Sequence, residues 1–165
     1  MKRFQQAESA VIVGISVGGE PESESASRWE ADEPDRYFFI ESYAAAVVEA
    51  LISEARSRLC QWAGELSRVL LPHYSPGYQE WSVADQLKVH TLLAQFGDMP
   101  GELEVMESGM LQPRVSQLVV FGVVSAAKAP QEDADMIPCK YCAQTPCELR
   151  RAALRCDQVS ALGKA

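Results

Sequence analysis

Four of the five cysteines lie within the last 27 residues of the chain, at a spacing that suits metal binding. They are Cys139, Cys142, Cys147 and Cys156. A Cys-x2-Cys pair brings two thiolates to one side of a tight turn, where both can hold the same ion. Four-cysteine sites contain either structural zinc or an iron–sulfur cluster, and the spacing does not choose between them. The alternative interpretation is a set of reduced thiols in a C-terminal tail.

Acid–base or nucleophilic catalysis finds little support in the sequence. The chain has two histidines, His73 and His90, and His90 falls in the middle of a predicted helix. The glycines after the first predicted strand lack the later glycine and the lysine of a phosphate-binding loop. No His-Glu-x-x-His helix is present. We therefore assign no catalytic residue.

The hydrophobic pattern predicts the elements that must position such groups. A β-branched run at residues 10–17 predicts a buried strand. Apolar residues at three- and four-residue spacing predict a helix over residues 41–62, and Ser82 is placed to cap a second helix that ends near Phe96. Two more strands are expected at residues 103–106 and 116–124. The acidic segment 20–27 is interpreted as a surface loop, with a frayed helix start as the alternative.

This order of strands and helices predicts an α+β fold, with helices packed on a mixed or antiparallel sheet. It does not repeat the βαβ unit of a doubly wound fold. We expect one domain over residues 1–127 and a linker rich in Pro, Asp and Glu over residues 128–138. A cysteine-rich tail then occupies residues 139–165.

Net charge excludes some classes of partner. The chain carries 15 basic and 23 acidic residues, a net charge of -8 and a pI near 4.8. An acidic surface repels phosphate groups, so neither nucleic acid nor an anionic membrane is expected as a partner. No apolar run approaches the roughly 20 residues of a membrane-spanning helix. Together with the clustered, odd number of cysteines, this predicts a cytoplasmic protein.

Four segments, taken in order, resemble a known family. The loop Ser75-Pro76-Gly77-Tyr78, with Trp81 and Gln86 at matching distances, resembles the Arg-Phe-Ser-Pro-Gly-Tyr-Gly-Asp-Trp loop of the activation domain of vitamin B12-dependent methionine synthase, short stand-alone bacterial type. The Ser-Val-Gly turn at 16–18, the helix segment at 44–51 and the stretch at 106–116 resemble further family segments. The cysteine tail up to Arg150 also looks like one seen in stand-alone members.

The resemblance implies that the chain binds S-adenosylmethionine and helps to regenerate an inactive corrinoid. In that family an electron from flavodoxin or a ferredoxin-like donor reduces the cobalt, and S-adenosylmethionine methylates it. The implied partner is a cobalamin-binding methyltransferase domain. The binding residues that it implies are His73, Ser75, Pro76, Gly77, Tyr78, Glu107 and Ser116. For Glu107 and Ser116 a purely structural role is an equal alternative.

Two departures from the family pattern keep a second hypothesis open. His73 stands where the family has an arginine, and a neutral imidazole lacks the two-pronged grip of a guanidinium on a carboxylate. The family also carries a segment ahead of its first strand that contributes an acidic group, and this sequence begins near that strand. The alternative is therefore a degenerate, non-catalytic interaction protein that kept the fold and lost the ligand.

Overall fold

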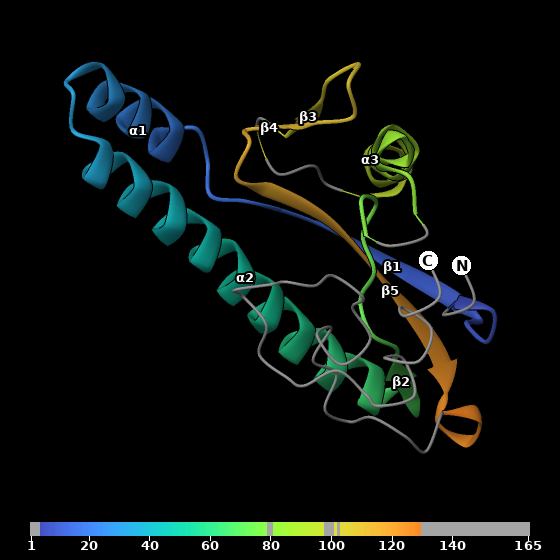
Figure 1. Ribbon diagram of the computed structural model, residues 1–165. Helices are drawn as coiled ribbons and strands as arrows, with labels where there is room; N and C mark the ends of the chain where they lie inside the picture. Colours follow the sequence, from blue (N-terminus) through green and yellow to red (C-terminus); the bar gives the residue numbers. More distant parts are fainter. Residues whose placement is uncertain (1–3, 79–80, 98–100, 102, 130–165) are drawn as a thin grey trace, which may run out of the picture. The chain divides into compact units, whose positions relative to one another are not determined.

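The computed structural model describes residues 4–78, 81–97, 101 and 103–129 (Figure 1). Apart from the last two of these residues, all belong to the first of the two units into which the chain divides, Met1–Ala127. Most of the expected linker and the four cysteines of the expected tail lie outside the described residues. The account below therefore concerns the first unit.

A three-stranded antiparallel sheet forms the centre of this unit, in the order β1-β5-β2. The outer strand β1, Ser9–Ser16, runs along the full length of the central strand β5, Ser116–Ser125, so that Ser9 faces Val123 and Ser16 faces Ser116. The short strand β2, Arg68–Leu70, pairs with the other edge of β5. Because β5 is central, its residues are buried on both faces.

The long helix α2, Pro34–Glu65, covers one face of the sheet (Figure 1). Its side chains at three- and four-residue spacing, among them Val48 and Ile52, pack on alternate residues of β5 such as Val119 and Phe121. Ile52 is 2% exposed and Phe121 is fully buried. The helical period of α2 and the two-residue period of β5 therefore meet in one apolar layer.

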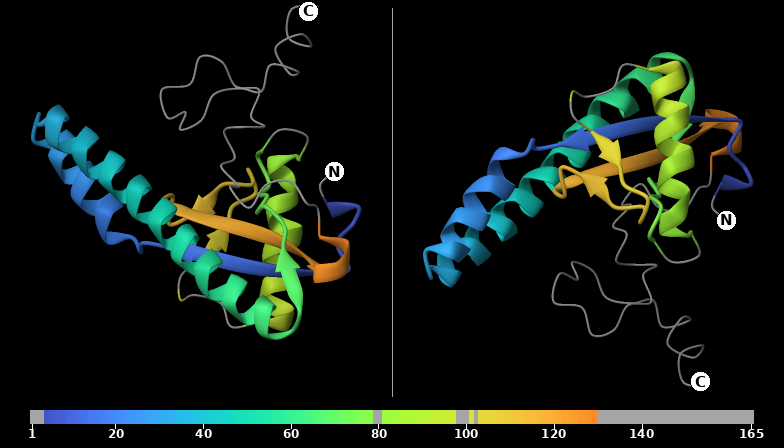
Figure 2. Two further views of the ribbon diagram at one scale, coloured as in Figure 1. Left: turned by 90° about the horizontal axis from the view of Figure 1, so that it is seen from below. Right: turned by 90° about the horizontal axis from the view of Figure 1, so that it is seen from above.

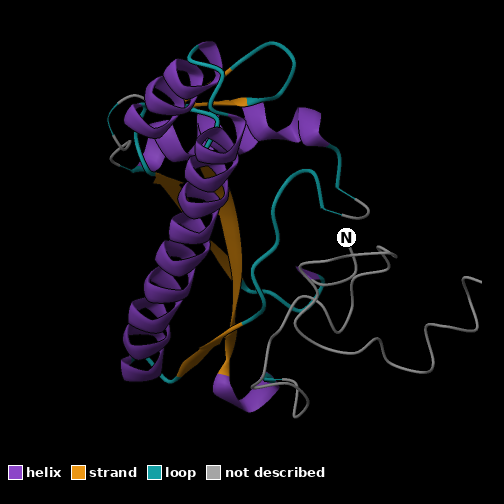
Figure 3. Ribbon diagram, turned by 60° about the vertical axis from the view of Figure 1, so that its left-hand side comes forward, coloured by secondary structure: helices purple, strands orange, loops and turns teal. Residues whose placement is uncertain are grey.

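Helix α3, Gln86–Phe96, covers the opposite face together with a small hairpin. The hairpin strands are β3, Glu104–Val105, and β4, Leu111–Gln112. Val89 of α3 packs with Leu118 and Val120, the β5 residues that point away from α2. Figure 3 shows the sheet between its two helical coverings. The result is an α+β arrangement of layers.

The acidic segment expected to be a loop is a helix, α1, Glu20–Glu30, so that prediction was wrong. α1 has no apolar stripe of the kind that identifies a helix in a sequence. It packs antiparallel to the first half of α2, and the two helices extend together beyond the end of the sheet (Figure 2). Ser25, fully buried, donates hydrogen bonds to the Glu22 carbonyl at 3.0 Å and to Glu41 Oε1 at 2.7 Å. Polar contacts rather than apolar burial fix this helix.

The other predicted elements are confirmed. The strands near residues 10, 103 and 116 and both helices are present, and α2 begins at Pro34, seven residues before the predicted start. Ser82 caps a 3-10 turn, Val83–Asp85, and not α3 itself: its hydroxyl accepts a hydrogen bond from Ala84 N at 3.3 Å. The N-cap of α3 is Asp85, which forms no side-chain capping bond, so the predicted cap was wrong by one turn. None of the helices in the described residues is long and apolar enough to cross a membrane.

Candidate functional site

The loop at residues 73–78 is fixed to the central strand at its first half. Tyr74 forms a β-bridge to Val120, with both backbone hydrogen bonds at 2.9 Å. The chain then turns: Tyr78 N donates to the Ser75 carbonyl at 3.1 Å, and Gly77 N donates to the Trp81 carbonyl at 3.0 Å. Gly77 has a φ of +93°, which favours glycine, and it is exposed at the turn while Ser75 and Pro76 are buried.

Gln117 of β5 holds the second half of this loop. Its Nε2 donates to the Ser75 hydroxyl at 3.4 Å and to the Tyr78 hydroxyl at 3.2 Å. Both predicted hydroxyl groups therefore converge on one amide that the sequence analysis did not single out. The sequence did contain one signal for Gln117: it is a polar residue in a strand that is otherwise apolar from Leu118 to Val124. Gln117 is consequently part of the candidate site.

Aromatic packing supports the loop from the α3 side. The rings of Tyr74 and Trp81 stack at 5.6 Å between centroids, and Phe4 meets both rings edge to face. Trp81 Nε1 also donates to Asp85 Oδ2 at 3.2 Å, at the start of α3. Large rings with specific contacts leave the turn little freedom to rearrange. The loop is thus held before any ligand arrives.

His73 lies on the α2 side of the sheet, against the loop. Its ring is 5.8 Å from that of Phe121 and 6.2 Å from that of Tyr78. Burial lowers the pKa of His73 below its ordinary value of 6.5, and the positive charge of Arg56 lowers it further. The imidazole is therefore uncharged at neutral pH, and it offers a hydrogen bond rather than a charge.

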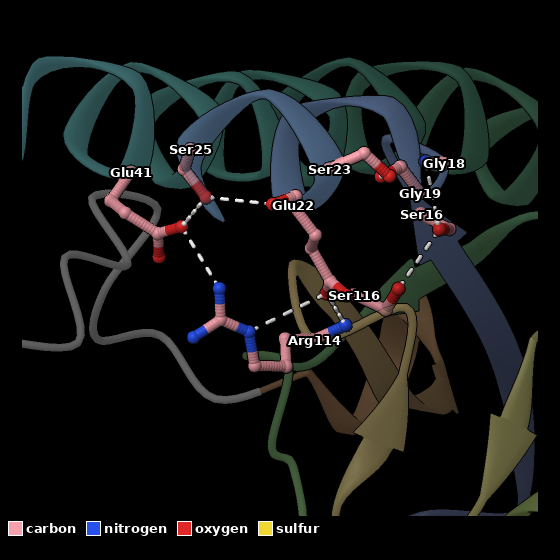
Figure 4. A network of polar contacts seen from close by, with 9 residues as sticks. All are labelled: Ser16, Gly18, Gly19, Glu22, Ser23, Ser25, Glu41, Arg114 and Ser116. Atoms are coloured by element: carbon pink, nitrogen blue, oxygen red, sulfur yellow. Dashed lines mark hydrogen bonds and ion pairs between the residues drawn. The ribbon is translucent and has the colours of Figure 1, made fainter. Parts of the chain in front are cut away.

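Ser116 is paired with Ser16 rather than with the loop. The Ser116 hydroxyl donates to Ser16 Oγ at 2.9 Å, and Ser16 Oγ also accepts from Gly18 N at 3.1 Å (Figure 4). Two of the segments that carry the family resemblance, the 16–18 turn and the stretch ending at Ser116, therefore meet. They meet one residue away from Gln117, at the end of the sheet where β1 finishes and β5 begins.

An open cleft of about 740 Å³ lies beside this serine pair. Its lining comes from the end of β1, the first turns of α1 and the hairpin region: Ser16, Gly18, Gly19, Glu20, Ser23, Glu24, Gly101 and Pro113. The volume lies in the usual range for a small-molecule pocket. None of the loop residues 73–78 is among the lining residues. The predicted site residues thus divide between the loop and the neighbourhood of this cleft.

Arg114 connects this region to both helices of the α1–α2 pair (Figure 4). Its guanidinium lies 2.9 Å from Glu41 Oε1 and 3.7 Å from Glu22 Oε1, and its backbone N–H donates to Glu22. Burial lowers the pKa of Arg114, but Glu41, Glu22 and a hydrogen bond to Tyr37 together outweigh that effect and raise it. Arg114 therefore ties the segment between β4 and β5 to α1 and α2 through its charge.

Glu107 lies apart from the other predicted residues. It is exposed in the turn of the β3–β4 hairpin, which is closed by Met106 N donating to the Met110 carbonyl at 2.8 Å. The structure brings it neither to the loop nor to the lining of the cleft. This position supports a structural or surface role for Glu107.

The predicted metal ligands Cys139, Cys142, Cys147 and Cys156 lie outside the described residues. Within the described ranges, no group of three or more His, Cys, Asp or Glu side chains is arranged to hold a metal ion. Cys60, the remaining cysteine, is free and exposed on α2. The metal prediction therefore stays a prediction.

S-adenosylmethionine carries a carboxylate, an ammonium, a sulfonium and an adenosyl group. At the loop, the described residues offer the exposed backbone of Gly77 and the guanidinium of Arg56, which has no carboxylate partner among them. The Ser75 hydroxyl is buried, and like that of Tyr78 it already accepts a hydrogen bond from Gln117. Acidic side chains that suit positive groups lie at the separate cleft, where Glu24 is also paired with Arg28. The residue types suit such a ligand, and they are divided between the loop and the cleft.

No family model and no curated protein matches the sequence. The function of the chain is therefore inferred from its own residues and geometry.

Proposed function

We propose that the protein binds S-adenosylmethionine and acts, in the cytoplasm, as an accessory module that reactivates a corrinoid-dependent methyltransferase such as methionine synthase. The observation that carries this proposal is the fixed 73–78 loop, in which Ser75 and Tyr78 converge on Gln117 while Gly77 stays exposed. A rigid turn with exposed backbone is suited to hold a polar cofactor without a large entropic cost.

The contribution of this chain is to bind and to orient. S-adenosylmethionine supplies the methyl group, and the cobalt that receives it belongs to the partner's corrinoid. A flavodoxin or ferredoxin-like donor provides the one electron that the reaction consumes. Gln117 and the Tyr74–Trp81 stack keep the loop in place. No side chain has to move a proton, which agrees with the lack of a catalytic constellation.

Direct binding tests the proposal. The full chain, purified without oxygen, is titrated calorimetrically with S-adenosylmethionine, with S-adenosylhomocysteine as the demethylated comparison. We expect saturable binding that falls at least tenfold in Tyr78→Phe and further in Tyr78→Ala. Tyr43→Phe is the matched control, since Tyr43 is exposed on α2, far along the chain from the loop. Unchanged binding in both Tyr78 variants would place the ligand elsewhere.

Substitutions of Gly77 also test the loop, but they are expected to change binding and stability together. Among the described residues, a Cβ at this position meets only Val83 Cγ2, at 3.9 Å, so these residues leave room for a methyl group. The positive φ nevertheless strains any L residue there by about 1–2 kcal/mol. Gly77→Ala and Gly77→Val are therefore expected to reduce binding together with stability, and the Tyr78 variants decide the question.

A second candidate is an interaction protein of the same fold that has lost the ligand. Two observations favour it: His73 is uncharged, and large aromatic side chains are exposed on the α1–α2 pair, including Trp29, Phe38 and Phe39. The variant His73→Arg separates the two candidates. A gain in affinity for S-adenosylmethionine indicates a residual site, whereas no binding before or after the change supports the interaction protein.

Partner binding completes the test. Addition of a cobalamin-binding methyltransferase domain to the titration should strengthen the binding of S-adenosylmethionine if the site is shared between the proteins. If the cysteine tail holds an iron–sulfur cluster that relays the electron, the anaerobic protein will be brown. A colourless protein with bound zinc would assign the tail a structural role instead.

A further inference from the structure

The arginines in the described part of the chain differ in one respect. Five of the six form an ion pair with a carboxylate, and Arg56 does not. The paired ones are Arg28, Arg36, Arg58, Arg68 and Arg114. Arg56 is also only half-exposed, and its Nε is shielded from solvent without a hydrogen-bond partner among the described residues. A guanidinium in this condition is costly for a protein to keep.

Arg56 occupies the sheet-facing side of α2. It follows Ile52 by four residues and precedes Ala63 by seven, and both of these are buried in the cluster that contains Phe121. His73 packs edge to face on the same Phe121 ring, and the Arg56 charge acts on His73. Arg56 therefore lies on the same face of the sheet as His73, the first residue of the loop, and as Gln117, which binds Ser75 and Tyr78.

We infer that Arg56 is the subsite for the carboxylate of the bound ligand, with the His73 imidazole as a neutral neighbour. This inference rests on the proposed function, because it assigns one group of S-adenosylmethionine to one side chain. A guanidinium binds a carboxylate through two parallel hydrogen bonds, and a half-buried position strengthens them. The missing acceptor of Nε is then provided by the ligand.

The inference makes a specific prediction for the free protein. If Arg56 has no acidic partner in the chain, Arg56→Gln removes an uncompensated charge without breaking an ion pair. The variant should unfold at the same denaturant concentration as the wild type or at a higher one. A clear loss of stability would show that Arg56 is paired with an acid of its own chain, and the inference would be wrong.

Two ligands that differ only in the carboxylate test the subsite itself. The full chain is titrated with S-adenosylmethionine and with decarboxylated S-adenosylmethionine. The wild type should bind the decarboxylated compound about 10- to 100-fold more weakly, as the loss of a charge-assisted pair implies. Arg56→Gln should bind S-adenosylmethionine that much more weakly and should no longer distinguish the two compounds.

Arg58→Gln is the matched control, because Arg58 is on the same helix, exposed and paired with Glu54 at 2.8 Å. It should bind both ligands as the wild type does. If Arg56→Gln still prefers the carboxylate-bearing compound by the wild-type ratio, the carboxylate binds elsewhere and the subsite is refuted.

A measurement without ligand tests the placement of Arg56 separately from the proposed binding of S-adenosylmethionine. The imidazole proton signal of His73, assigned with His73→Gln, is followed by NMR as a function of pH. Arg56→Gln should raise the pKa of His73, since it removes a neighbouring positive charge. If the wild type binds neither compound, the proposed function fails; if the His73 signal is also unchanged in Arg56→Gln, the placement of Arg56 fails as well.

Discussion

The side-chain amide of Gln117 donates a hydrogen bond to the phenol oxygen of Tyr78 at 3.2 Å, and so ties a loop to a strand 39 residues later in the chain. The same amide reaches the buried hydroxyl of Ser75. One side chain of the central strand therefore sets the position of both hydroxyl groups in the candidate site. Loop and sheet are consequently expected to respond together to mutation.

Gln117→Leu should lower the free energy of unfolding by about 1–2 kcal/mol, because it breaks both hydrogen bonds and leaves the Ser75 hydroxyl buried without its partner. Chemical denaturation measures this effect, and calorimetry should show weaker binding of S-adenosylmethionine. Gln112→Leu, an exposed change on β4, is the control and should stay within about 0.5 kcal/mol of the wild type. Equal effects of the two variants would contradict a role for Gln117 in holding the loop.

Arg114→Met should loosen α1. Arg114 contacts Glu22 of α1 and Glu41 of α2, but its side chain is 47% exposed, so the loss in stability should be only about 1 kcal/mol. The larger effect should be local: faster hydrogen exchange at the amides of α1, measured by mass spectrometry. Raising the salt concentration should shrink the difference from the wild type.

The control for this variant is Arg58→Met, which removes a highly exposed pair with Glu54 and should leave exchange in α1 unchanged. A double-mutant cycle with Glu41→Gln isolates the contact itself. If the effects of Arg114→Met and Glu41→Gln add without any coupling, the pair does not contribute to fixing α1.

His73 should make stability depend on pH. Its pKa is lowered in the folded protein, first by burial and then by Arg56, so the unfolded chain binds a proton more readily. The contribution of His73 is therefore fully present above its ordinary pKa of 6.5 and is lost as the pH falls through the lower, folded value. We expect the wild type to lose stability relative to His73→Gln as the pH is lowered below 6.5. A constant difference between the two proteins would contradict a lowered pKa.

The central part of the fold follows from local patterns. The segment 41–62 of α2 buries residues at the period of a helix, and the apolar strand β5 buries residues at the period of a strand. Both periods can be recognised in the sequence alone. The first turns of α2 contain Tyr37, Phe38 and Phe39 in succession, with no such period, and they were missed. The strands β2 and β4, three and two residues long, are too short to leave a pattern.

Residues whose role depends on distant partners could not be predicted. The Pro-Gly turn identified the loop, since those residue types restrict the backbone locally. Gln117, Arg56 and Arg114 acquire their roles only when the sheet, α2 and α1 come together. α1 was missed for the same reason: the fully buried Ser25 is a polar residue that sequence periodicity assigns to the surface.

Alanine substitution should have opposite effects on stability at two glycines, Gly122 and Gly64. At Gly122 the N-terminal segment packs closely on the sheet. A Cβ at Gly122 would lie 2.9 Å from Phe4 Cδ1 and 3.0 Å from Leu71 Cδ1, so Gly122→Ala should destabilise the protein by about 1–3 kcal/mol. At Gly64, near the end of α2, a Cβ meets no atom of the described residues within 4 Å. Gly64→Ala should stabilise by about 0.5–1 kcal/mol through its helix preference. Thermal unfolding of both variants measures the contrast, and a stable Gly122→Ala would argue against this packing.

The cysteine tail gives a prediction that needs only the purified chain. If Cys139, Cys142, Cys147 and Cys156 bind one metal centre, anaerobic protein should contain about one zinc ion or one iron–sulfur cluster per chain, measured by elemental analysis and visible absorption. Cys139→Ser should lose it, because a tetrahedral site tolerates the loss of a thiolate poorly. Cys60→Ser, which changes the exposed cysteine of α2, should retain the full content. Metal content that is absent from the wild type, or equal in both variants, would leave the cysteines as reduced thiols and remove the electron-relay interpretation.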